Sequence, residues 1–465
     1  MITQTNHKET FRFTPTTSVE IPPERIAMLL KSEWELFTQK TGKSAEESKR
    51  SFKSLPLGVT SSFQHWDPYP ISIVSAKGAW MTDVDGRELL DLSMGFGAML
   101  AGHLNPVIVE EVKKALETGT LFVTPSPIST DAAERICRRF GIDQVRFTNS
   151  GTESTMYAVR TARAATDKNA IVKIEGGYHG SYDPFVVSSK PPIDQIGDPS
   201  DPIAHIPAGI VPGEIYVVPY NDADALERTF IKHADSIACL ILEPVLENLG
   251  IVLPDEGYLE RVRDLCDQYN VVLIFDEVKT GLTAGHQGAA QRLGVTPDLI
   301  TLAKSIGGGL TLAAFGGKKK YMDFVTNGKM AHFGTFNGNP LAMAGVRAAD
   351  IIFTEASLEK AEAFNQQALD RIGAIIEKYQ LPAHTVGFGV KGCVTWSTSP
   401  VRNYRDYKAT DFAIAELSWL FSLNRGIITP PGLDEQWLIS LAHGQREVDI
   451  LVNDFEELAQ ALRSE

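Results

Sequence analysis

The 465-residue chain is long enough to bury a large core, and its length favours two or three domains. Its net charge of −14, without any long basic cluster, disfavours nucleic acid and anionic membranes as partners. A hydrophobic share of 43% and a charged share of 22% are ordinary for a globular protein, so we expect small-molecule substrates.

Cysteine usage and the N-terminus indicate a cytoplasmic protein. The four cysteines lie far apart, form no CxxC pair and have no histidines at zinc-site spacing, so neither a disulfide framework nor a metal site is expected. The first 20 residues lack the apolar core of a signal peptide, and no apolar run approaches the length of a membrane span.

Three regions follow one another along the chain. Residues 1–75 are predicted to form an N-terminal arm, a helix from Pro23 and an irregular, aromatic-rich loop at residues 55–73, which is a candidate substrate loop. Residues 76–345 begin with a hairpin signal at Asp85-Gly86 and continue as a large domain. Residues 346–465 combine helical patterns with short strands, as in a smaller α+β domain.

Strand and helix patterns alternate within the large domain. Apolar runs of strand length, separated by helical patterns, occur at residues 145–149, 170–175, 237–244, 271–275 and 299–303. This alternation predicts an α/β fold, with a mostly parallel sheet flanked by helices.

An acid and a lysine follow two of these strands. Asp276 comes directly after residues 271–275, and Lys304 comes directly after residues 299–303. Alone, such an aspartate is usually a cap or turn former, and such a lysine is usually solvated. Because the carboxyl ends of parallel strands share one edge, the two side chains can meet at one ligand. An amine and an ionised carboxylate together suit pyridoxal phosphate.

Further polar residues follow other strands. Asn149-Ser150-Gly151-Thr152 precedes a helix and can bind phosphate, although such a segment alone is more often a plain N-cap. Tyr178-His179 offers a ring that could stack on a cofactor or simply pack a loop. Asn248 and Thr335 lie in polar segments that could also reach a cofactor.

Taken in order, six segments resemble the signatures of class III aminotransferases of pyridoxal phosphate fold type I. They are RFTNSGTE, EGGYHG, EPVLEN, FDEVKTG, TLAKSIGGG and GTFNGNP. From about residue 55 to the end, the sequence is most similar to those of glutamate-1-semialdehyde aminomutases and their aminotransferase relatives. The resemblance implies a seven-stranded-type, mostly parallel sheet and a homodimer with its sites at the interface.

The resemblance also implies roles for single residues. Lys304 is the Schiff-base lysine and Asp276 the partner of the pyridine nitrogen. The other cofactor-binding residues that it implies are Ser150, Gly151 and Thr152 at the phosphate, Tyr178 and Val278 on the two ring faces, His179 near the same edge, Asn248 at the phenolic oxygen, and Thr335 at the neighbouring subunit's phosphate.

The substrate loop departs from the family pattern. Aminomutases that this chain resembles carry an arginine for the substrate carboxylate where Gln64 stands, and related β-amino acid aminotransferases carry one where Ser61 stands. Glu435 does match a family glutamate. Trp66, with Phe63 and Tyr69, either shapes an apolar substrate pocket or packs the loop. If acidic substrates are preferred, another cation, such as Arg402 or Arg425, must replace the arginine.

The sequence therefore predicts a pyridoxal-phosphate-dependent aminotransferase, which moves an amino group between an amine or amino acid and a keto acid or aldehyde by a ping-pong mechanism. The alternative is glutamate-1-semialdehyde 2,1-aminomutase or another external-aldimine enzyme, such as a racemase or decarboxylase. A non-catalytic cofactor-binding regulator is a third interpretation, which the presence of both Lys304 and Asp276 disfavours.

Overall fold

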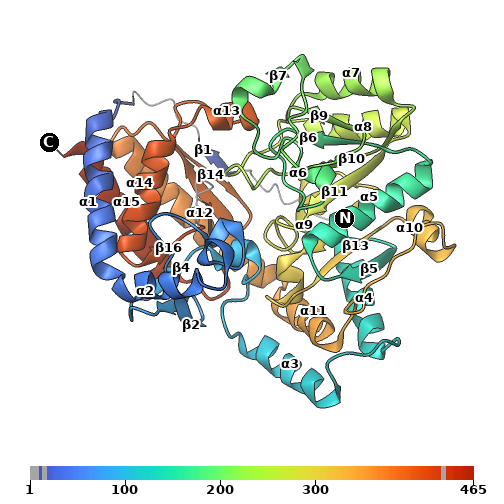
Figure 1. Cartoon of the computed structure of the whole chain (residues 1–465), viewed down its shortest axis with the longest axis horizontal. Coiled ribbons are helices and arrows are strands. Elements are labelled where there is room, and N and C mark those ends of the chain that lie inside the picture. Colours follow the sequence, from blue (N-terminus) through green and yellow to red (C-terminus); the bar gives the residue numbers. More distant parts are fainter. Residues whose placement is uncertain (1–9, 13–17, 431–435, 465) are drawn as a thin grey trace. The chain divides into compact units, whose positions relative to one another are not determined.

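The computed structural model describes residues 10–12, 18–430 and 436–464 and divides them into two compact units (Figure 1). The central unit consists of Pro106–Glu355 together with Val401–Lys408. The terminal unit contains the described residues up to Asn105, then Ala356–Pro400 and those from Ala409 onward. Each unit has its own sheets and core.

A seven-stranded sheet forms the middle of the central unit. Its strands, in spatial order, are β5 (Gln144–Thr148), β13 (Ala313–Gly317), β12 (Leu299–Ala303), β11 (Val272–Glu277), β10 (Ile237–Leu242), β6 (Ala170–Ile174) and β9 (Ile215–Val218). Only β13 is antiparallel to its neighbours, so the predicted, mostly parallel sheet is confirmed.

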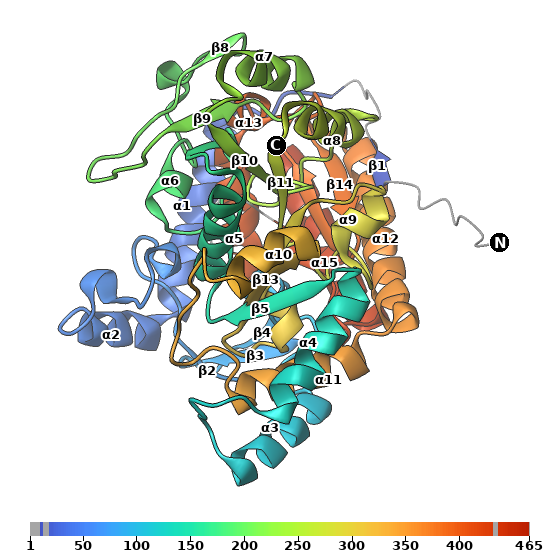
Figure 2. The ribbon, with the colours of Figure 1, turned by 90° about the vertical axis from the view of Figure 1, so that its right-hand side faces the viewer.

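Helices cover both faces of this sheet because its central strands are apolar on both sides. Leu273 and Phe275 of β11 pack in one core with α7 (Ala223–His233) and α8 (Tyr258–Tyr269). Ile274, which points the opposite way, packs in another core with α5 (Gly151–Thr166). Figure 2 shows the three helices around the strands. Each such buried side chain contributes about 1.5–3 kcal/mol relative to exposure.

The antiparallel strand β13 was not expected, because its sequence AAFGG ends in two glycines, which are poor strand formers. The structure explains the glycines by close packing. A Cβ at Gly316 would stand 2.8 Å from Ile142 Cδ1, and one at Gly317 would stand 2.9 Å from Leu299 Cα. Glycine is therefore required where this strand passes between β5 and β12.

Other helices complete the central unit. They are α3 (Pro106–Thr118), α4 (Pro127–Phe140), α6 (Asp183–Val186), α9 (Gly288–Leu293), α10 (Lys319–Thr326), α11 (Pro340–Ile352) and α13 (Tyr404–Lys408), and a small β7–β8 pair spans Gly197–Asp198 and Asp201–Pro202. Arg405 brings α13 to the sheet, since its guanidinium lies 3.0 and 3.1 Å from the two carboxylate oxygens of the buried Glu175.

The terminal unit contains two four-stranded sheets. One is β1 (Thr10–Arg12), β14 (His384–Phe388), β15 (Lys391–Thr395) and β17 (Gln436–Leu438), and the other is β16 (Ile427–Ile428), β4 (Glu88–Asp91), β3 (Trp80–Asp83) and β2 (Ile73–Lys77). The antiparallel pairing of β3 with β4 confirms the hairpin predicted at Asp85-Gly86.

Five helices pack in this unit: α1 (Pro23–Lys40), α2 (Gly42–Ser51), α12 (Glu355–Lys378), α14 (Phe412–Asn424) and α15 (Gln445–Arg463). Phe37 of α1 is buried against Trp419, Leu420 and Leu423 of α14. Among the helices of the described ranges, none is long and apolar enough to cross a membrane.

Candidate active site

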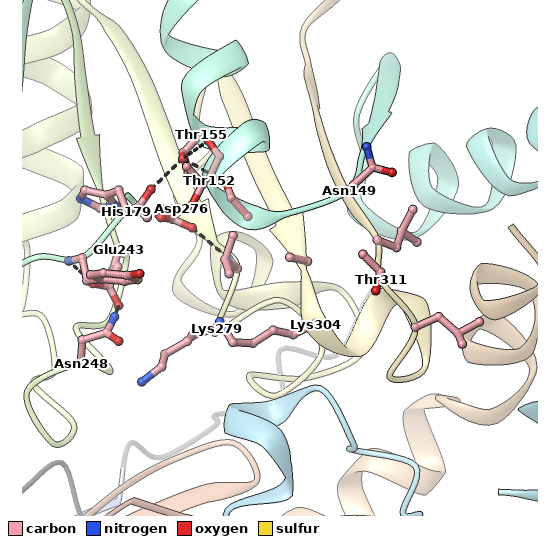
Figure 3. A pocket seen from close by; sticks show the side chains of 17 residues that line it. Asn149, Thr152, Thr155, His179, Glu243, Asn248, Asp276, Lys279, Lys304 and Thr311 are labelled. Atoms are coloured by element: carbon pink, nitrogen blue, oxygen red, sulfur yellow. Dashed lines mark hydrogen bonds and ion pairs between the residues drawn. The ribbon is translucent and has the colours of Figure 1, made fainter. Parts of the chain in front are cut away.

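A cavity of about 290 Å³ opens in the central unit at the carboxyl ends of the parallel strands (Figure 3). This is the position at which ligands bind in open α/β sheets. Its lining residues are Asn149, Gly151, Thr152, Thr155, Tyr178, His179, Gly180, Glu243, Asn248, Asp276, Val278, Lys279, Ala303, Lys304, Leu310, Thr311 and Leu312. Eight of the ten residues predicted to bind the cofactor are among them.

Asp276 is a buried carboxylate held from three sides. Its Oδ2 lies 2.8 Å from His179 Nδ1, while Oδ1 accepts hydrogen bonds from the Val278 amide at 3.0 Å and the Thr301 hydroxyl at 3.1 Å. These three contacts fix the orientation of the carboxyl group. The chain therefore presents a pre-oriented carboxyl group at the cavity wall. The sequence placed Asp276 just beyond its strand, but β11 continues through Glu277.

Lys304 begins the turn that follows β12 and lines the same cavity. Its φ of 55° is in the left-handed region, where a residue with a Cβ is strained by about 1–2 kcal/mol. The parallel pairing of β11 with β12 aligns Asp276 with Thr301, three residues before Lys304. Lys304 is thus a strained residue in a packed site, and residues of this kind often have a functional role.

The N-terminus of α5 forms another wall of the cavity. Ser150 caps the helix by accepting a hydrogen bond from the Glu153 amide at 3.2 Å, as the alternative interpretation of this segment expected. Ser150 itself is not among the lining residues, whereas Gly151 and Thr152 are. The free amides and positive dipole end of a 16-residue helix make this wall suitable for a phosphate.

Two glycines leave space beside this wall of the cavity, which we call the phosphate cradle. A Cβ at Gly151 would stand 3.2 Å from Val278 Cγ1, and one at Gly180 would stand 2.8 Å from Thr152 Cα. Gly180 also has a φ of 99°, which residues with side chains rarely adopt. The backbone of residues 179–181 can thus approach α5, and the Thr152 hydroxyl accepts a hydrogen bond from the Ser181 amide at 3.1 Å.

Glu243 organises the opposite side of the cavity, a role that the sequence did not reveal. Its carboxylate accepts hydrogen bonds from the Tyr178 amide at 3.1 Å, the Glu247 amide at 3.2 Å and the Asn248 side chain at 2.8 Å. Burial raises the pKa of Glu243, and the nearby Asp276 raises it further. Glu243 therefore orients both Tyr178, whose ring is half-exposed, and Asn248.

Hydrogen bonds from neighbouring elements hold the loop that carries Tyr178 and His179. The fully buried Lys173 ammonium donates hydrogen bonds to the carbonyls of Gly177, Phe185 and Val187 at 2.9, 3.0 and 2.5 Å. Burial lowers the pKa of Lys173 to about 7. The Thr155 hydroxyl donates to the His179 carbonyl at 2.7 Å, which fixes the imidazole next to Asp276.

The remaining predicted residues lie elsewhere. Thr335 is exposed and is not among the residues that line the cavity. Gln64 and Trp66 belong to the terminal unit, where Gln64 Oε1 accepts hydrogen bonds from Thr60 and Ser61 and the Trp66 ring lies edge-on to Trp419. Glu435 lies outside the described residues.

The two arginines considered as substitute cations are already paired. Arg402 forms two hydrogen bonds with the carboxylate of Asp255, and Arg425 Nη1 lies 3.1 and 3.2 Å from the carboxylate oxygens of Glu33. The cavity also contains residues without a predicted role, notably Lys279 and Thr311. Lys279 stands inside the FDEVKTG segment, so its spacing from Asp276 was the available signal.

Comparison with known proteins agrees with this geometry. The profile of the family described as aminotransferase class-III matches residues 62–407. Glutamate-1-semialdehyde 2,1-aminomutases of Methanocella arvoryzae and Methanocorpusculum labreanum are 36% and 37% identical to this chain over 90% of its length, covering 98% and 100% of their own lengths.

Solved structures give the same result. An omega-transaminase from Sphaerobacter thermophilus aligns with a TM-score of 0.85 at 32% identity and covers 90% of this chain and 98% of its own. A glutamate-1-semialdehyde aminomutase from Pseudomonas aeruginosa, solved with PMP, aligns with a TM-score of 0.88 at 25% identity, over 96% of this chain and all of its own. The chain belongs to the class III aminotransferase family and is a pyridoxal-phosphate-dependent enzyme of fold type I.

Proposed function

We propose that the central-unit cavity is the catalytic site of an aminotransferase that moves an amino group between an amine or amino acid and a keto acid or aldehyde. One observation carries the proposal. A lysine and a buried, hydrogen-bonded carboxylate line a single cavity, at the carboxyl ends of two adjacent parallel strands and next to a helix N-terminus. An amine, a fixed negative charge and a phosphate cradle are the groups that pyridoxal phosphate requires.

The residues present fit the cofactor. Gly151 and Thr152 at the start of α5, with Ser150 capping the helix, would hold the phosphate. The Asp276 carboxylate would hold a proton on the ring nitrogen, and His179 would keep that carboxylate in place.

The ring faces and the phenolic oxygen have candidate partners as well. Val278 would contact one face of the ring and Tyr178 the other. Asn248, which Glu243 orients, would donate a hydrogen bond to the phenolic oxygen.

The cofactor and the residues of the chain contribute different parts of the proposed chemistry. When bound, pyridoxal phosphate supplies an aldehyde that condenses with amines and a ring that withdraws electrons from the substrate carbon. Lys304 would anchor the cofactor between turnovers and, once displaced, would move the proton from the substrate carbon to C4′ of the cofactor. Asp276 would keep the ring nitrogen protonated.

We infer that the enzyme transfers an amino group between two substrates rather than moving it within a single substrate. The relatives named as aminomutases act on glutamate-1-semialdehyde according to their names, and the arginine expected for its carboxylate is replaced by Gln64. The Gln64 carbonyl is engaged within its own loop. Gln64, Trp66 and Glu435 are proposed to shape the substrate site, with specificity unlike that of the aminomutases.

We also propose a homodimer in which Thr335 reaches the phosphate of the partner's cofactor. Phe333 and Phe336, on either side of Thr335, are 81% and 60% exposed. Large exposed aromatic side chains that flank a polar residue favour burial in an interface.

A half-reaction screen tests the proposed function. The cofactor-loaded protein is mixed with a panel of amines and amino acids without a carbonyl acceptor, and the visible absorbance of the bound cofactor is followed. We expect bleaching with formation of one carbonyl product per site, and turnover only after an acceptor is added. No bleaching with any donor would reject the aminotransferase. Isomerisation of glutamate-1-semialdehyde without an acceptor would favour the aminomutase instead.

A further inference from the structure

The cavity contains a second lysine to which the proposed chemistry gives no role. Of the 17 residues drawn in Figure 3, Lys279 and Lys304 are the two with ammonium groups, and none is an arginine. Lys304 is assigned to the cofactor. Lys279 is only half-buried and follows Asp276 by three residues.

Strand pairing brings the two lysines to equivalent positions. The register aligns Asp276 with Thr301 and Glu277 with Leu302, so Lys279 and Lys304 each come two residues after the last paired position. The two lysines thus follow the ends of neighbouring strands, and both line the cavity.

Its ammonium is directed to the segment that carries Asn248. Lys279 Nζ donates a hydrogen bond to the carbonyl of Glu247, the residue before Asn248. Its positive charge lowers the pKa of the buried Glu243, which in turn holds Asn248. The Lys279 ammonium therefore lies beside the segment that carries Asn248, which is proposed to contact the cofactor.

A substrate carboxylate needs such a charge. An ionised carboxylate that leaves water is costly to bury unless a cation or several donors receive it. The loop at residues 55–73 contains no lysine or arginine, and neither Arg402 nor Arg425 is among the residues that line the cavity. Of the two lysines that line it, Lys279 is the one that is not assigned to the cofactor.

We propose that Lys279 forms an anion subsite that binds a carboxylate of the amino donor or the carbonyl acceptor, which assigns amino acids and keto acids as the preferred substrate class. The inference rests on the proposed aminotransferase function. Lysine is a compact point charge on a flexible stem, unlike the planar fork of arginine, so the subsite accepts carboxylates at different distances from the amine.

Binding of unreactive ligands tests the subsite without turnover. Unbranched monocarboxylates of two to six carbons and 3-phenylpropionate, each with its matching amide, are titrated calorimetrically into the cofactor-loaded protein. Lys279→Met is compared with wild type, with Lys279→Arg, and with Lys232→Met, which removes an exposed charge from α7. We expect Lys279→Met to raise the Kd of the carboxylates about 10-fold or more and to leave that of the amides unchanged.

Lys279→Arg is expected to retain most of the carboxylate affinity, Lys232→Met to have no effect, and wild-type affinity to fall as salt is added. Equal weakening of carboxylates and amides in Lys279→Met would assign Lys279 a structural role, holding Glu247, and overturn the proposal. Wild-type protein that prefers no carboxylate over its amide would overturn it as well. The half-reaction screen is a separate measurement, so failure of the subsite and failure of the aminotransferase are distinguishable.

Discussion

His179 Nδ1 and Asp276 Oδ2 lie 2.8 Å apart, and both side chains are buried. The two residues are far apart in sequence, on the loop after β6 and at the end of β11. Buried carboxylates are stable when their oxygens are hydrogen-bonded, and here the imidazole, a hydroxyl and an amide meet that need. The orientation of the Asp276 carboxyl group is therefore set by the folded protein before any ligand binds.

Replacement of this charge tests its role. Asp276→Asn keeps the shape and removes the negative charge, so we expect kcat to fall by at least about 100-fold, the scale on which a single electrostatic group acts. Single-turnover absorbance measurements check this, with urea unfolding as a check on the fold. Asp264→Asn, on the exposed face of α8, is the control. Wild-type kcat in Asp276→Asn would remove the residue from the mechanism.

Lys304→Ala is expected to bind pyridoxal phosphate without covalent attachment. Borohydride treatment followed by mass spectrometry should find the adduct in wild type and not in the variant. Lys304→Gly should likewise form no adduct. It should unfold at a higher urea concentration than Lys304→Ala, because glycine tolerates the φ of 55° that costs alanine about 1–2 kcal/mol. An adduct that persists in both variants would place the attachment site elsewhere.

Gly180→Ala is expected to obstruct the phosphate cradle. Its Cβ would meet Thr152 and would also require a φ of 99°. We expect a loss of about 1–3 kcal/mol in the free energy of unfolding and weaker cofactor binding, measured by urea unfolding and by fluorescence titration. Gly257→Ala has a φ of 77° but no atom within 4 Å of the added carbon, so it isolates the backbone strain. Equal effects in both variants would contradict a specific role for the contact.

Thr335→Ala tests the proposed contribution of a partner subunit. Loss of one hydrogen bond to a charged phosphate should raise the Kd of the cofactor about 10-fold while the mass in solution remains that of a dimer. Equilibrium dialysis and light scattering measure the two quantities, and Thr326→Ala on α10 is the exposed control. Monomeric wild-type protein, or unchanged affinity in Thr335→Ala, would reject the shared site.

The terminal unit should show a pH-dependent stability that depends on Asp454. Burial raises the pKa of Asp454 to about 6, and its Oδ2 accepts a hydrogen bond from Ser422 at 2.6 Å. A carboxyl group whose pKa is higher folded than unfolded stabilises the fold below its unfolded pKa, and that contribution is lost as pH rises through about 6.

Asp454→Asn removes this titration. Relative to wild type it should gain on the order of 2–3 kcal/mol in the free energy of unfolding above pH 6, and much less near pH 4. Urea unfolding at a series of pH values measures the difference. If the unfolding free energies of Asp454→Asn and wild type differed by the same amount at every pH, burial of the Asp454 carboxyl group would have no electrostatic cost.

Local pattern was sufficient to predict the elements that position the cavity. The continuous apolar runs before Asp276 and Lys304 indicated strands buried on both faces, and the hydroxyl of Ser150 indicated a helix start. These features depend on neighbouring residues only. The prediction of pyridoxal phosphate needed more, because it rested on the resemblance of six segments, taken in order, to class III aminotransferases.

Features that depend on distant pairing could not be predicted. Glu243 looks like any strand-terminal acid, and only the folded chain shows that it holds Tyr178 and Asn248. Strand β13 was missed because its glycines reflect the crowding imposed by neighbours rather than an intrinsic preference. The roles of Thr335 and Gln64 depend on groups beyond the cavity and stay predictions.

The antiparallel strand has a consequence for the dimensions of the site. Ala313 of β13 pairs with Thr148 on one side and with Ala303 on the other. Thr148 lies two residues before the cap of α5, and Ala303 directly precedes Lys304. Two strand spacings, about 10 Å in all, thus separate the end of the strand that leads into α5 from the end of the strand that leads into Lys304. Hydrogen bonds within the sheet fix this separation, so substitutions in the surrounding helices should leave the distance between the two strand ends unchanged, whereas an insertion near Ala313 would alter it.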